Sequence, residues 1–112
     1  MNIIIYASKR DFNVQKAERW FKERGVKYAF MDIKKRPVGK REMELFYQKL
    51  GRAGLVNLQS KQYLESTARF LQTTGPFIEA LMEKPELLNT PIVRNGNEVT
   101  SGYKPEVWVG WE

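Results

Sequence analysis

The chain has 112 residues, of which 42% are hydrophobic and 12% aromatic, so it is long enough for one domain with a real core and too short for two. It contains no cysteine and no histidine, which excludes disulfides, thiolate and imidazole catalysis, and the usual zinc or iron sites. The formal charge of +6 is compatible with acidic partners or nucleic acid, although net charge alone does not define a binding site.

Neither a membrane span nor a secretion signal is predicted. No apolar run approaches the length of a membrane-spanning helix, and Met1 leads directly into a strand-like segment without the regions of a signal peptide. We therefore expect a cytoplasmic protein with one domain over residues 1–112. We also expect a monomer with no cofactor and no metal.

The first third of the chain predicts a strand, a helix and a second strand. Residues 3–6 are almost entirely apolar, which is typical of a central strand covered on both faces. Residues 13–24 have helical periodicity with Gly25 in the position that follows a helix, and residues 26–33 read as the second strand. Short links make this a βαβ unit, so we expect parallel strands and a right-handed crossover.

The basic run at residues 34–36, with Lys40 and Arg41 beyond it, is the densest positive segment. Pro37 and Gly39 interrupt it, which favours a solvated loop over a recognition helix. A helix is predicted over residues 42–50, ended by Gly51 and Gly54. Its apolar face carries Met43, Phe46, Tyr47 and Leu50.

The segment from 55 to 73 is ambiguous, and we favour a short helix or a pair of turns. Its apolar side would carry Tyr63, Leu64, Ala68 and Leu71. Gly75 and Pro76 then open another helix, which Pro85 stops.

The C-terminal part predicts a hairpin and a short helix. Residues 91–94 and 98–100 are strand-like and flank the turn sequence at 95–97. Pro105 begins the last helix, which carries Val107, Trp108 and Trp111.

Residues 3–17 form the most informative stretch, because a strand there runs directly onto the N-terminus of a helix. The N–H groups and dipole at such a helix end stabilise a thiolate or a bound oxyanion. Tyr6, Lys16 and Ala17 resemble the opening of the arsenate reductase and Spx-like family, a branch of the thioredoxin fold. That alignment places Asp11 on the family's catalytic cysteine.

The resemblance continues along nearly the whole chain. It is carried by Asp32-Ile33 with residues 34–37, by residues 84–88, by Pro91-Ile92-Val93 and by residues 102–105. It implies an α/β thioredoxin-like fold with a mixed four-stranded sheet, built from a βαβ unit and a C-terminal ββα unit, with a helical insertion at about 40–84. It also implies a cis Thr90–Pro91 bond that places Pro91 close to Asp11.

The family's catalytic residues do not carry over. Besides the cysteine at Asp11, the two arginines that hold the oxyanion fall on Gln59 and Thr90. The Spx-like CxxC pair would fall on Asp11 and Val14. A carboxylate is not a two-electron redox group and repels arsenate, so we expect no catalytic residue here.

The candidate site residues are therefore binding residues: Lys9, Arg10, Asp11, Phe12, Thr90 and Pro91. Asp11 is expected mainly as the N-cap of the helix, and Lys9 and Arg10 are either solvated or attract an anion. Phe12 lies in an exposed loop beside the old cysteine position, where it would suit an anchor for a protein partner.

Three functions remain open. The leading hypothesis is a non-catalytic arsenate reductase/Spx-like protein that acts through a protein partner, with a regulatory role. The alternatives are an oxidoreductase that uses glutathione or a partner thiol along the cis-proline edge, and a basic factor associated with transcription or nucleic acid.

Overall fold

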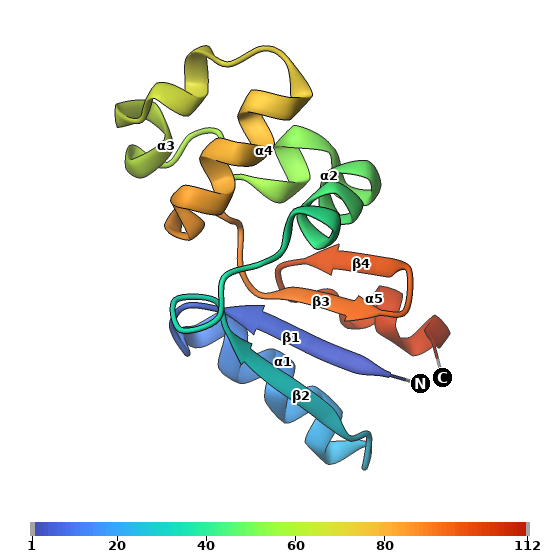
Figure 1. Ribbon diagram of the computed structural model, residues 1–112. Helices are drawn as coiled ribbons and strands as arrows, with labels where there is room; N and C mark the ends of the chain where they lie inside the picture. The colour runs from blue at the N-terminus through green and yellow to red at the C-terminus, as the bar shows by residue number, and fades with distance from the viewer. Residues whose placement is uncertain (1, 112) are drawn as a thin grey trace.

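Strand β1 (Ile3–Ala7) lies inside a four-stranded sheet in the computed structural model, which describes residues 2–111. The sheet order is β2-β1-β3-β4, with β2 at Tyr28–Asp32, β3 at Ile92–Asn95 and β4 at Glu98–Ser101. β1 pairs in parallel with β2 and antiparallel with β3, and β3 pairs antiparallel with β4 (Figure 1). The central position of the first strand and the mixed sheet are both confirmed.

One face of the sheet is covered by α1 (Phe12–Glu23) and by the C-terminal helix α5 (Pro105–Trp108), which η3 (Val109–Trp111) extends. Trp108 is completely buried between these elements. Its ring lies 5.0 Å from that of Phe21 and 5.5 Å from that of Trp20, centroid to centroid. These aromatic contacts fix α1 against the sheet, and so fix the position of the turn that enters α1.

The other face carries the helices between β2 and β3, as Figure 1 shows. They are α2 (Lys40–Leu55), α3 (Lys61–Glu65), η1 (Thr67–Phe70), α4 (Thr74–Glu83) and η2 (Pro85–Leu87). Their shared core with the sheet includes Tyr6, Phe46 and Phe77, all completely buried. The helical insertion expected at about 40–84 is therefore present. No helix within residues 2–111 is long and apolar enough to cross a membrane.

Two expectations for the insertion are wrong in detail. The helical backbone does break at Gly51, whose φ of 69° and ψ of 176° are not helical, but it was not expected to resume and continue to Leu55. Leu64 was expected on the buried side but is 46% exposed. The reason is that α3 has only five residues before the chain turns into η1, so Tyr63 and Ala68 face the core and Leu64 does not.

The C-terminal expectations hold. β3 and β4 form the predicted hairpin, with Gly96 at φ 61° in its turn. The Thr90–Pro91 bond is cis, as the resemblance implied. Because Tyr6 pairs with Ile92, the start of β3 beside Pro91 lies near the end of β1, where the chain turns into α1.

Candidate functional site

Asp11 caps the N-terminus of α1. Its Oδ1 accepts a hydrogen bond from the backbone N–H of Val14 at 3.0 Å, and its backbone carbonyl accepts from the N–H of Gln15 at 2.9 Å. The Gln15 side chain donates a hydrogen bond from Nε2 to the Arg10 carbonyl at 2.8 Å. A carboxylate therefore occupies the helix end that would otherwise favour a bound anion.

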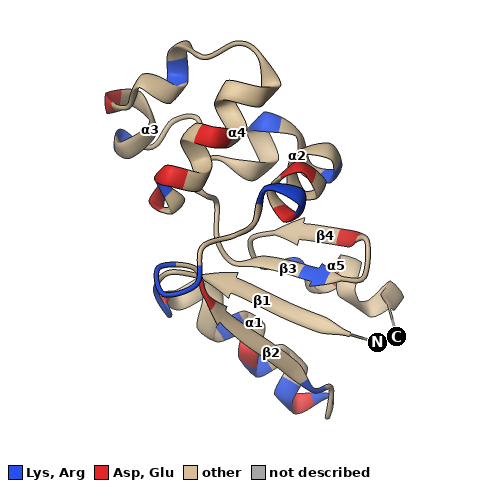
Figure 2. Ribbon diagram, viewed as in Figure 1, with Lys and Arg blue, Asp and Glu red and all other residues tan. Residues whose placement is uncertain are grey.

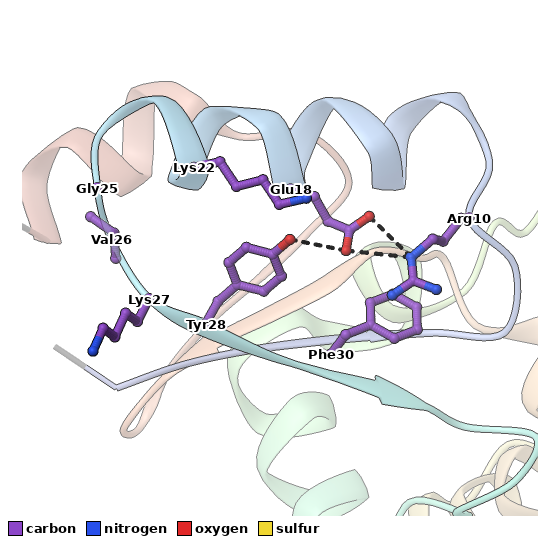
Figure 3. A pocket seen from close by; sticks show the side chains of 8 residues that line it. All are labelled: Arg10, Glu18, Lys22, Gly25, Val26, Lys27, Tyr28 and Phe30. Carbon is purple, nitrogen blue, oxygen red and sulfur yellow. Dashed lines mark hydrogen bonds and ion pairs between the residues drawn. The ribbon is translucent and has the colours of Figure 1, made fainter.

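Arg10 is directed along α1 toward β2. Its Nε lies 3.2 Å from Oε2 of Glu18, and its guanidinium carbon lies 3.9 Å from the centroid of the Phe30 ring. Glu18 is 9% exposed and also accepts a hydrogen bond from the Tyr28 hydroxyl at 3.1 Å (Figure 3). Arg10 was expected either to be solvated or to attract an anion near Asp11; its charge is instead paired with Glu18.

Phe12 was expected in an exposed loop but is the first residue of α1, where its side chain is 72% exposed. The Lys16 Nζ lies 4.9 Å from the centroids of both the Phe12 and Tyr103 rings, which brings a cation between two aromatic faces. We call Phe12, Lys16 and Tyr103 the Phe12 surface. Phe12 was a predicted site residue, whereas Lys16 and Tyr103 were not, although both belong to segments that carry the resemblance.

The remaining predicted site residues lie at two places. Pro91 is buried, with its carbonyl accepting from the Gly102 N–H at 2.8 Å, and the Thr90 N–H donates to the Leu88 carbonyl at 3.1 Å. Gln59 is exposed in the turn before α3, where its N–H donates to Oδ1 of Asn57 at 3.1 Å. The closeness of Pro91 to Asp11 stays a prediction, and the structure gives no contact between Gln59 and Asp11 within residues 2–111.

A second constellation, which the sequence did not predict, lies on the opposite face of the sheet. The hydroxyl of the buried Tyr6 donates to Oε2 of Glu42 at 2.6 Å, and Nη1 of Arg94 lies 3.7 Å from the same oxygen. Burial, and then the hydrogen bond to Glu42, raise the pKa of Tyr6 to about 12. These contacts join β1, α2 and β3. Only the position of Glu42 three residues after Gly39, a helix-start pattern, offered a local signal.

Two charged side chains of the turn, Asp11 and Arg10, have partners within the chain. Neither can accept and return electron pairs as a thiol does. Within residues 2–111 no group of three or more aspartates and glutamates is arranged to hold a metal ion.

Replacing Asp11 tests its capping role. Asp11→Ala should lower the free energy of unfolding by about 1 kcal/mol, because the Val14 N–H loses its acceptor, whereas Asp11→Ser should retain most of the stability. Urea denaturation followed by circular dichroism measures both. Equal stability of wild type and Asp11→Ala, or an equal loss in both variants, would contradict the assignment.

The raised pKa of Tyr6 predicts a loss of stability at high pH. A folded-state value of about 12, above the ordinary value of about 10, favours the neutral phenol in the folded protein. The stabilisation is therefore complete below about pH 10 and lost as the pH rises through about 12. In Tyr6→Phe this part of the pH dependence should be absent in denaturation series between those values. Parallel curves for the two proteins would show that Tyr6 does not contribute.

Comparison with known proteins gives the family. The sequence profile described as the ArsC family matches residues 6–110. An arsenate reductase from Vibrio cholerae is 21% identical, with a TM-score of 0.82 over 98% of this chain and 97% of that one.

Two further solved structures have the same fold. A protein from Bacteroides fragilis, described as related to the ArsC family, is 22% identical with a TM-score of 0.81 over 100% of both chains. An arsenate reductase related protein from Brucella melitensis is 20% identical with a TM-score of 0.73, over 99% of this chain and 94% of that one. A comparison with curated proteins found no match. The chain belongs to the ArsC family, and it does so without a cysteine.

Proposed function

We propose that this ArsC-family protein is non-catalytic and acts by binding a protein partner in a regulatory role. The observation that carries the proposal is the Asp11 carboxylate on the Val14 N–H, at the helix end where the resemblance places the catalytic cysteine. An arsenate at this position would meet a negative charge and no nucleophilic sulfur. The absence of arginine at Gln59 and Thr90 supports the same conclusion.

The Phe12 surface supports a protein as the ligand. A phenylalanine that is 72% exposed adds nothing to the core of the protein, and exposed aromatic side chains are frequent anchors in protein interfaces. Lys16, placed between the rings of Phe12 and Tyr103, adds a positive charge to the same place. A partner with an apolar pocket for Phe12 and a carboxylate near Lys16 would complement this surface.

The charge around the turn favours an acidic partner. The Ile33 N–H donates to the Ala7 carbonyl at 3.1 Å, so the chain leaves β1 and β2 side by side. The exposed Lys9 follows one strand, and the exposed residues 34–36 follow the other. Figure 2 shows basic residues gathered in both connecting segments. A bound acidic surface would relieve the repulsion among these cations.

Partner capture from native cell extract tests the proposal. A protein retained by wild type should be lost by the double variant Phe12→Ala, Lys16→Glu, because the anchor is removed and the charge that would face the partner's carboxylate is inverted. Phe70→Ala is the matched control, since Phe70 is 68% exposed but lies in η1 of the helical insertion. Circular dichroism would verify that all three proteins fold.

Equal capture by the wild type and the double variant would place the interaction elsewhere. Measurable DNA or RNA binding that decreases steeply with salt would favour the nucleic-acid alternative instead.

A further inference from the structure

β2 is an edge strand whose outer backbone groups have no strand beside them within residues 2–111. The Ile33 N–H bonds to Ala7 of β1, and residues of a parallel strand face a given neighbour alternately. Ala29 and Met31 therefore direct their N–H and C=O groups to β1. Tyr28 and Phe30 direct theirs to the open edge, where they are free to pair with another chain.

An open hollow of about 900 Å³ lies beside this edge, between β2 and α1. Figure 3 shows the Tyr28 and Phe30 side chains on the β2 side and Glu18 on the α1 side. The lining residues are Arg10, Glu18, Lys22, Gly25, Val26, Lys27, Tyr28 and Phe30. The two residues with outward backbone groups are thus also those whose rings line the hollow.

The charge of the hollow is positive. The carboxylate of Glu18 is engaged by Arg10 and by the Tyr28 hydroxyl. Burial, and then this hydrogen bond, raise the pKa of Tyr28 to about 12, so the hydroxyl remains a donor at neutral pH. Lys22 and Lys27 are both exposed and add two further positive charges at the rim. An incoming chain would therefore meet more positive than negative charge.

We propose that the edge of β2 receives an extended acidic segment of a partner protein, which adds to the sheet as a fifth strand. Backbone groups of the segment would bond to those of Tyr28 and Phe30, and its alternate side chains would enter the hollow. Glutamates suit these positions because their methylene groups lie against the two rings while their carboxylates reach Lys22 and Lys27.

The opposite side chains of the segment would lie along the exposed Ala29 and the half-buried Met31, which suits β-branched residues. A second copy of this chain is the less favourable occupant of the edge. Pairing two β2 strands would bring two sets of Lys22 and Lys27 together between chains that each carry a charge of +6.

This inference rests on the proposed function, because it assumes a protein partner, but it can fail separately. The probe is a synthetic peptide that alternates glutamate and valine, with a lysine-valine peptide as its counterpart. Hydrogen exchange of the purified protein, followed by nuclear magnetic resonance, reports on each amide of β2. The acidic peptide should slow exchange of the Tyr28 and Phe30 amides by about tenfold or more, while Ala29 and Met31, already bonded to β1, change little.

The matched variants are Lys22→Glu, Lys27→Glu and, as the control, Lys49→Glu, Lys84→Glu, two exposed lysines of the helical insertion. Both change the net charge equally, but only the first pair lines the hollow. The first should weaken binding of the acidic peptide by about tenfold, and the control by no more than about twofold.

Three results would overturn the inference: no slowing at the highest soluble peptide concentration, equal weakening in both variants, or a free protein that is dimeric with both outer amides already protected. Because only purified protein and peptide are used, arsenate turnover or a failed Phe12 capture would refute the proposed function without changing this result.

Discussion

The hydrogen bond from the Val14 N–H to the Asp11 carboxylate places a negative charge of the chain itself at the N-terminus of α1. A strand that ends at a helix N-terminus presents N–H groups and a positive dipole end, and this arrangement attracts an anion in many folds. Here the anion is supplied by the chain itself. The strand-to-helix turn is present, and the Asp11 carboxylate offsets the positive end of the α1 dipole.

The turn between β1 and α1 is positioned by contacts on both faces of the sheet. β1 is held on both sides by β2 and β3, and α1 is fixed against the sheet by the contacts of Trp108 with Trp20 and Phe21. On the other face, Tyr6 joins the sheet to α2 through Glu42. These contacts fix the position of the turn that enters α1, and with it the exposed ring of Phe12 at the start of that helix.

Local patterns predicted much of this arrangement. The apolar run of β1, the helical period of α1 and the turn sequence around Gly96 each depend on neighbouring residues, and the structure confirms all three. The features that were missed depend on distant ones. The helix resumes after Gly51 because Leu55 is buried and its carbonyl accepts the Asn89 N–H at 2.7 Å, a contact across the insertion.

The candidate site shows the same division. The capping role of Asp11 follows from its place before a helix and was predicted. Glu18 has no such local signal, since a glutamate on a short helix is normally solvated. Its burial results from the convergence of Arg10 from the turn and Tyr28 from β2. The hollow beside β2 could not be predicted from the sequence, because its lining residues come from separate elements that only the fold brings together.

The reduction of arsenate by the purified protein, in the presence of glutathione and glutaredoxin, tests the central claim most directly. A carboxylate in place of the thiolate, with glutamine and threonine at the arginine positions, predicts no reduction above the background without protein. Clear turnover that depends on the protein would contradict the account, because it would require redox chemistry at a site that Asp11 closes.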